Sequence, residues 1–200
     1  MRTNRDELLS GMQPAVAERD VVTGSDVSLL VVSYPDMQQQ SSDWIAGIRR
    51  QYPELSHSVL APHFTFVFPT SGVSENVLVA HVAGCAGRVH PIAFTLRSSL
   101  LVKDDSGDTY YVLLVPDEGF SGVVKLHDKL YTGPLADRLR LDIPFIPHIT
   151  VGYSTDAQFS KSVVDALNAG EFEIEGTIAA LDIVSKEGTA ARTIRRLNLQ

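Results

Sequence analysis

Short apolar runs bounded by prolines or polar turns alternate along the chain with stretches of helical spacing, beginning at residue 27. The run at 27–34 is rich in β-branched residues and stops at Pro35, which predicts a buried strand. The polar segment 103–108 lies between two β-rich runs and predicts a hairpin. The whole pattern predicts strands at 27–34, 63–68, 92–102, 109–115, 146–153, 171–185 and 191–199, and helices at 41–53, 74–86, 120–131 and around 163–167. This mixture of strands and helices is typical of an α/β (α+β) fold.

A short motif occurs twice, each time at the start of a predicted strand. The sequence APHFTFV at 61–67 aligns without gaps with IPHITVG at 146–152, and proline, histidine and threonine are identical in the two copies. The histidines are 85 residues apart, at 63 and 148, which is about half of the patterned region. The repeat predicts two similar α/β halves. Since no long linker divides them, we expect residues 26–200 to form one bilobal domain, preceded by an N-terminal arm at 1–25.

Each copy of the motif places its polar residues on one face of a strand. Residues i and i+2 of a strand point to the same side, so His63 and Thr65 project together while Phe64 projects into a helix-covered core. In the second copy His148 and Thr150 share a face in the same way. If a pseudo-twofold axis relates the halves, the two polar faces meet across one groove.

Two imidazoles facing one groove are suited to cleavage of a phosphodiester. The reaction takes a proton from the nucleophile and delivers another to the leaving oxygen, and an unperturbed pKa of about 6.5 lets one histidine be neutral while the other is protonated. The threonine hydroxyls can donate hydrogen bonds to the non-bridging phosphate oxygens. No metal or cofactor is required for this chemistry. The near symmetry of the motifs leaves open which histidine is the acid and which is the base.

The duplicated His-x-Thr motif, each copy preceded by proline, resembles the two-histidine phosphoesterase superfamily, which includes 2′-5′ RNA ligases and cyclic nucleotide phosphodiesterases. The resemblance covers about residues 27–199. It implies a bilobal fold in which two antiparallel-rich sheets flank a central cleft, with helices outside. It also implies cleavage of 2′,3′-cyclic phosphates or 2′-5′ linkages, with His63 and His148 as catalytic residues and Thr65 and Thr150 holding phosphate. Some members carry an arginine shortly after the second motif; here Tyr153 stands in that region and is a candidate to stack on a base.

The same residues are compatible with other functions. The cleft could bind a nucleotide or a phosphorylated metabolite without turnover, or residues 1–25 could dock a protein partner. A zinc site is disfavoured because zinc takes three or four ligands at short spacings, and threonine is a poor ligand. His127 falls on the apolar face of its predicted helix and is interpreted as a structural histidine at the edge of the core.

Charge and composition narrow the class of substrate. The net charge is −7, with 17 Lys and Arg against 24 Asp and Glu, whereas proteins that grip long nucleic acids carry a basic excess. We therefore expect a small nucleotide or an RNA end as the substrate. Cys85 is the only cysteine, and no apolar run approaches the length of a membrane helix. These features favour a cytoplasmic protein, expected to act as a monomer away from membranes.

Overall fold

The computed structural model describes residues 27–104 and 107–200, and the N-terminal arm expected at 1–25 lies outside these residues. The described strands are β1 (Ser28–Ser33), β2 (Asp36–Met37), β3 (Phe64–Thr70), β4 (Ile92–Lys103), β5 (Tyr110–Glu118), β6 (Ile149–Ser154), β7 (Ile174–Ile178), β8 (Ala180–Glu187) and β9 (Ala190–Asn198). The α-helices are α1 (Gln39–Gln51), α2 (Glu75–Ala86), α3 (Phe120–Leu130) and α4 (Ala157–Ala169), with a short 3₁₀ helix at Gly133–Arg138.

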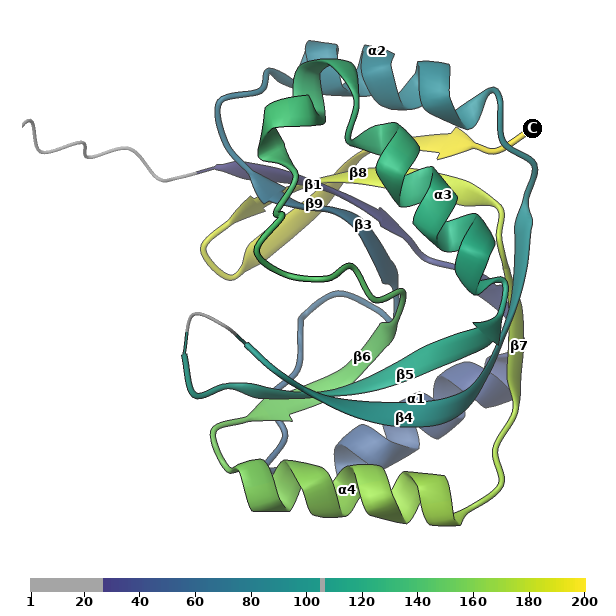
Figure 1. Cartoon of the computed structure of the whole chain (residues 1–200), viewed down its shortest axis with the longest axis vertical. Coiled ribbons are helices and arrows are strands. Elements are labelled where there is room, and N and C mark those ends of the chain that lie inside the picture. Colours follow the sequence, from purple (N-terminus) through teal and green to yellow (C-terminus); the bar gives the residue numbers. More distant parts are fainter. Residues whose placement is uncertain (1–26, 105–106) are drawn as a thin grey trace, which may run out of the picture.

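The strands form two antiparallel sheets, one in each lobe. The first sheet has the order β3-β1-β8-β9 and the second has the order β2-β7-β4-β5-β6. Helices α2 and α3 lie on the outer side of the first sheet, and α1 and α4 lie on the outer side of the second (Figure 1). The predicted α/β architecture of two sheets with helices outside is thereby confirmed.

The lobes are interleaved along the chain instead of following one another. Helix α1 lies between β1 and β3 in sequence, yet it packs against β6 of the other sheet. Helix α3 lies between β5 and β6 in sequence, yet it packs against β3. The two crossings are related by the internal repeat, and each motif strand is therefore covered by a helix from the opposite half of the repeat.

Several predicted boundaries differ from the observed ones. The segment 171–185 is not one strand: it divides into β7, in the second sheet, and β8, in the first, because the chain passes between lobes at Ala179. Helix α1 begins at Gln39, two residues before the predicted start at 41, and Gln38 at its N-cap position makes no side-chain capping bond. By contrast, Ser74 caps α2 by accepting a hydrogen bond from the amide of Val77.

The two sheets share one buried apolar cluster. Phe64 on β3 and Phe94 on β4 meet edge to face with ring centroids 5.0 Å apart, so a side chain of the first motif packs directly against the second sheet. Phe66, Ile149 and Val151 are also fully buried. This packing confirms that the apolar residues between the motif's polar positions face the core, and it fixes both motif strands. None of the described helices is long and apolar enough to cross a membrane.

Candidate active site

The two motifs lie on the edge strands of the two sheets. β3 ends the order of the first sheet and β6 ends that of the second. His63 and His148 each stand one residue before the first residue of their strand, Phe64 or Ile149. Thr65, Thr150 and His148 line a cleft of about 660 Å³. His63 is not one of the lining residues, but its charge lowers the pKa of His148, and the ring of Tyr34 lies edge-on to its own at 6.1 Å between centroids.

Both histidines are held in the same way by the backbone two residues earlier. His63 Nδ1 lies 2.7 Å from the carbonyl oxygen of Ala61, and His148 Nδ1 lies 2.6 Å from that of Ile146. Because a carbonyl oxygen only accepts, each Nδ1 carries the proton and donates it. In the neutral imidazole the lone pair is then on Nε2. Each ring therefore has the atom that takes or gives a proton on the side away from its backbone anchor.

The surroundings of both imidazoles disfavour the protonated form. Burial lowers the pKa of His63 below its usual 6.5, and the positive charge of Arg49 lowers it further, against the opposing bond to Ala61. Burial also lowers the pKa of His148, and the charge of His63 adds to that shift, against the bond to Ile146. Since protonation of one ring hinders protonation of the other, the pair favours one proton shared between two sites over two.

We expect the free energy of unfolding to decrease as the pH falls from about 7.5 to about 5.5. In the unfolded chain these imidazoles take up protons near pH 6.5, whereas in the folded chain burial keeps their pKa lower, so protons favour unfolding below pH 6.5. The effect is about 1.4 kcal/mol for each unit by which a pKa is lowered. Urea denaturation at a series of pH values measures it. The decrease should be smaller in a His63→Gln, His148→Gln double variant; an equal decrease would contradict the interpretation.

Each motif strand carries a β-bulge at the same position of the repeat. In β3, Thr65 pairs with Val32 but Val67 pairs with Val31, which leaves Phe66 as the extra residue. In β6, Thr150 pairs with Leu113 but Gly152 pairs with Val112, which leaves Val151 as the extra residue. Phe66 and Val151 are aligned in the repeat. A bulge bends the strand and redirects the neighbouring side chains, so the repeat includes a backbone irregularity directly after each threonine.

The bulge in β6 decides where Tyr153 points. It shifts the alternation by one residue, so Tyr153 pairs with Tyr111 and lies on the same face of the sheet as Thr150. The rings of Tyr153 and Tyr111 are 5.5 Å apart, and Tyr111 is the one that lines the cleft. Tyr111 was not singled out from the sequence. The signal in the sequence is that Tyr111 and Leu113 are two residues apart on a predicted strand, which places them on the same face.

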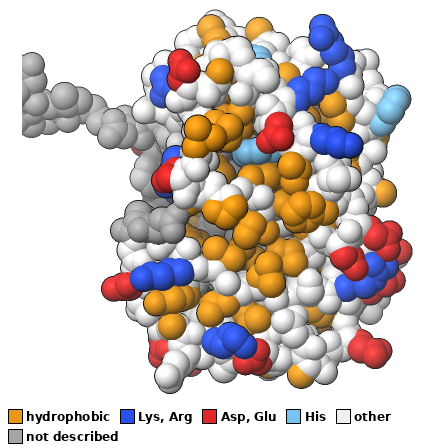
Figure 2. All heavy atoms as spheres, in the orientation of Figure 1, with side chains coloured by type: hydrophobic (Ala, Val, Ile, Leu, Met, Phe, Trp, Pro, Cys, Tyr) orange, Lys and Arg blue, Asp and Glu red, His pale blue; other side chains and the backbone are white. Residues whose placement is uncertain are grey.

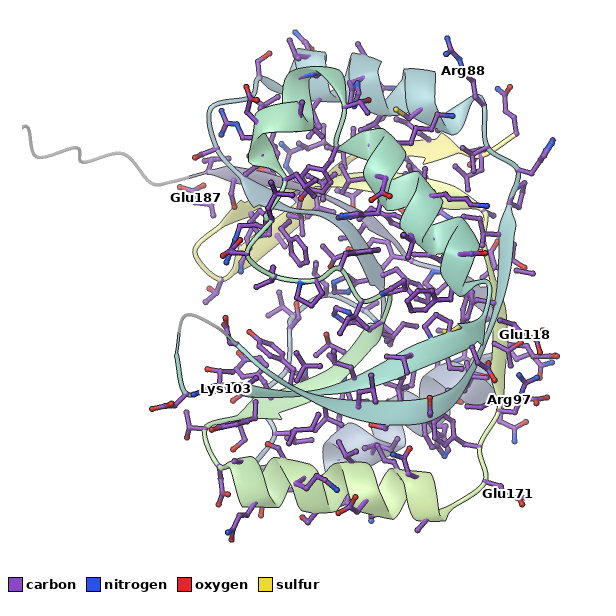
Figure 3. The ribbon with its side chains drawn as sticks, in the orientation of Figure 1. Arg88, Arg97, Lys103, Glu118, Glu171 and Glu187 are labelled. Atoms are coloured by element: carbon purple, nitrogen blue, oxygen red, sulfur yellow. The ribbon has the colours of Figure 1, made fainter. Side chains whose placement is uncertain are left out.

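The remaining wall of the cleft comes from the β4–β5 hairpin and from the segment that leads into His148. It is mostly apolar, and on the face shown in Figure 2 hydrophobic side chains gather across the middle. Lys103 stands at the end of β4 beside the hairpin turn (Figure 3) and pairs with Asp108 at 3.2 Å. Arg140 pairs with Asp142. The cations of the wall are thus partly neutralised by nearby carboxylates. The further lining residues are Phe68, Pro69, Val102, Asp104, Leu113, Ile143, Pro144 and Ile146.

His127 lies outside this cleft, as expected of a structural residue, although it is more deeply buried than the sequence indicated. Its side chain is 2% exposed and stacks parallel to Phe145 with ring centroids 3.6 Å apart. Its Nδ1 lies 2.9 Å from the carbonyl oxygen of Phe66. Among residues 27–104 and 107–200 no three His, Cys, Asp or Glu side chains gather in a way that could hold a metal ion.

Comparison with known proteins agrees with this arrangement. Residues 35–190 match the family described as the 2′-5′ RNA ligase superfamily. The structure of E. coli LigT complexed with 3′-AMP is similar at 19% identity, covering 88% of this chain and 99% of that one, with a TM-score of 0.55. The structure of TT0787 of Thermus thermophilus is similar at 16% identity, covering 86% and 97%, with a TM-score of 0.61. At these identities the likeness shows the fold. No curated protein is similar enough in sequence to count as a match.

Proposed function

Since the chain belongs to the 2′-5′ RNA ligase superfamily, as the resemblance to two-histidine phosphoesterases implied, we propose that it is a phosphodiesterase that works through His63 and His148. The bond we assign to it is that of a 2′,3′-cyclic phosphate or a 2′-5′ linkage, in a nucleotide or at an RNA end. The observation that carries the proposal is the matched anchoring of the two imidazoles by the carbonyls of Ala61 and Ile146.

In this proposal, the neutral imidazole takes a proton from water through Nε2 as the water oxygen bonds to phosphorus. The other imidazole, protonated, gives its Nε2 proton to the ribose oxygen as the phosphorus–oxygen bond to that atom breaks. Cyclic phosphate and water become a phosphomonoester and a free hydroxyl, and the two histidines end in exchanged protonation states. Thr65 and Thr150 donate to the non-bridging oxygens, where charge develops. The similar anchoring of the rings allows either one to serve as the base.

The cleft supports a small substrate. Its volume of about 660 Å³ lies within the range of small-molecule sites. We assign the nucleobase to the apolar wall beside Tyr111, whose ring is backed by Tyr153. The partners of Lys103 and Arg140 and the net charge of −7 favour one phosphate over a long polyanion. The similar E. coli LigT structure is a complex with 3′-AMP, a single nucleotide.

The test is hydrolysis of the four 2′,3′-cyclic nucleotides and of a 2′-5′-linked dinucleotide, with and without EDTA. We expect turnover of at least one of them at a rate that EDTA leaves unchanged, because both proton transfers are assigned to side chains of the chain. Phosphorus NMR of the products identifies the bond that is cleaved. Saturable binding without any turnover would overturn the proposal in favour of a non-catalytic nucleotide-binding protein.

A further inference from the structure

In each bulge the carbonyl oxygen of the extra residue accepts a hydrogen bond from a side chain. That side chain comes from the opposite half of the repeat. His127, on α3, donates from Nδ1 to the oxygen of Phe66 at 2.9 Å. Arg49, on α1, donates from Nε to the oxygen of Val151 and from Nη2 to the oxygen of Thr150, both at 2.9 Å. Phe66 and Val151 have no partner residue in their strand ladders, so these bonds satisfy groups that the sheet does not.

These two side-chain clamps, His127 on Phe66 and Arg49 on Thr150 and Val151, occupy corresponding places in the fold. Each comes from the helix that crosses to the other lobe, and each acts on the residue directly after the motif threonine, Thr65 or Thr150. The guanidinium of Arg49 takes two successive carbonyls of β6. In a regular strand such carbonyls point to opposite edges, so the bidentate contact requires the bulged form of the strand. The two halves of the repeat therefore share a hydrogen bond from a helix side chain to a bulge carbonyl, although the side chain is a histidine in one case and an arginine in the other.

Core packing alone does not account for these two side chains. His127 is 2% exposed, and burial lowers its pKa, so a hydrophobic residue would fill the site without placing a polar ring in the core. Arg49 is half-buried, burial lowers its pKa, and within the part of the chain that the structure describes it forms no ion pair with a carboxylate. Its positive charge also lowers the pKa of His63 in the first motif. Both side chains are instead suited to hold a particular backbone shape.

We propose that Arg49 and His127 are positioning residues of the phosphodiesterase site, each locking the bulge that aims one motif's threonine at the phosphate. The inference rests on the proposed function. Neither residue touches substrate in this scheme; they act through the backbone of Phe66 and Val151. A small displacement of the threonine donors weakens contacts that matter most in the transition state, so the effect should fall on kcat more than on KM.

Two substitutions at His127 separate its hydrogen bond from its packing. His127→Phe keeps the ring that stacks on Phe145 but has no donor, whereas His127→Asn loses the ring and keeps a donor at the position of Nδ1. We expect His127→Phe to lower kcat by about 10²-fold with KM little changed, and His127→Asn to retain most of the kcat. The opposite order would show that His127 contributes packing only and would overturn the assignment.

At Arg49 the matched pair is Arg49→Met, which keeps the bulk, and Arg49→Gln, which keeps an amide donor without charge. We expect a loss of kcat in Arg49→Met and partial recovery in Arg49→Gln. Arg50→Met, at an exposed position of the same helix, is the control for helix α1. His81→Phe is the control for His127, because His81 also bonds a carbonyl, that of Leu130, which belongs to helix α3 and not to a motif strand.

A readout that needs no substrate keeps this inference separate from the proposed function. Backbone carbon chemical shifts of 65–67 and 150–152 report the shape of the bulges. They should change in His127→Phe and Arg49→Met respectively, and stay as in the wild type in His127→Asn and both controls. Unchanged shifts in the first two variants would overturn the inference. If the wild type hydrolyses none of the substrates while the chemical shifts of the variants change as expected, only the proposed function is overturned.

Discussion

Replacing either His63 or His148 with alanine will lower kcat/KM for a 2′,3′-cyclic nucleotide by about 10²–10⁴-fold, the range that a general acid or base contributes. Each ring is half of a pair in which one Nε2 removes a proton and the other supplies one, so the loss of either stops the exchange. The double variant should be little worse than a single one, because residues that act as a unit give strongly non-additive effects. Steady-state kinetics with a 2′,3′-cyclic nucleotide that the wild type hydrolyses measures the loss of kcat/KM in each variant.

The control for this experiment is His57→Ala. His57 lies in the exposed loop before the first motif, and its Nδ1 is 3.1 Å from the carbonyl oxygen of Ser58. We expect it to keep wild-type kinetics. Thermal unfolding of all variants shows whether the fold is kept, so that a loss of activity is assigned to chemistry and not to unfolding. Full activity in the double variant of His63 and His148 would refute the two-histidine mechanism.

Replacing Gly152 with valine will destabilise the fold by about 1–3 kcal/mol, the usual cost of forcing extra atoms into a packed site, and will lower activity as well. A β-carbon at residue 152 would lie 2.8 Å from Cβ of Leu55 and 2.9 Å from the carbonyl oxygen of Ser56. Ser56 and Tyr153 exchange both backbone hydrogen bonds, at 2.9 and 2.8 Å. The substitution pushes this loop off β6, and the loop leads directly to His63.

Chemical denaturation of Gly152→Val beside Gly84→Ala checks this prediction. Gly84 is exposed on α2, and an added β-carbon there meets nothing within 4 Å, so Gly84→Ala should be neutral or stabilising. In Gly152→Val the chemical shift of the His63 ring should also move, because the path of its loop has changed. Wild-type stability together with an unmoved His63 signal would show that the contact of Leu55 and Ser56 with β6 does not hold the site.

The sequence by itself determined the parts of this protein that depend on local spacing. Alternation along 61–67 and 146–152 separated Phe64 and Ile149, which are buried, from Thr65 and Thr150, which line the cleft. Helix α2 and the hairpin of β4 and β5 were predicted for the same reason, since turns, caps and periodicity act over a few residues. The matched motifs pointed to the family, and the resemblance to that family implied the two sheets with helices outside.

Other features were decided only by tertiary structure. A bulge exists only relative to the register of a partner strand, so Phe66 and Val151 look like ordinary strand residues in the sequence. The sequence position of Tyr153 was enough to propose it as a base-stacking residue. Its pairing with Tyr111 could not be predicted, because that pairing depends on the register after the bulge. The division of 171–185 into β7 and β8 depends on which sheet each half joins, and that choice leaves no local mark.

The clamps show the same limit most clearly. His127 and the carbonyl of Phe66 are 61 residues apart in sequence, and Arg49 and the carbonyl of Val151 are 102 apart. A histidine on an apolar helix face and an arginine near a helix end have common local explanations. Both side chains bond backbone oxygens, which every residue has. The identities of the accepting residues, Phe66 and Val151, therefore do not reveal these contacts in the sequence. Only the crossing of α1 and α3 between lobes brings each donor to its bulge.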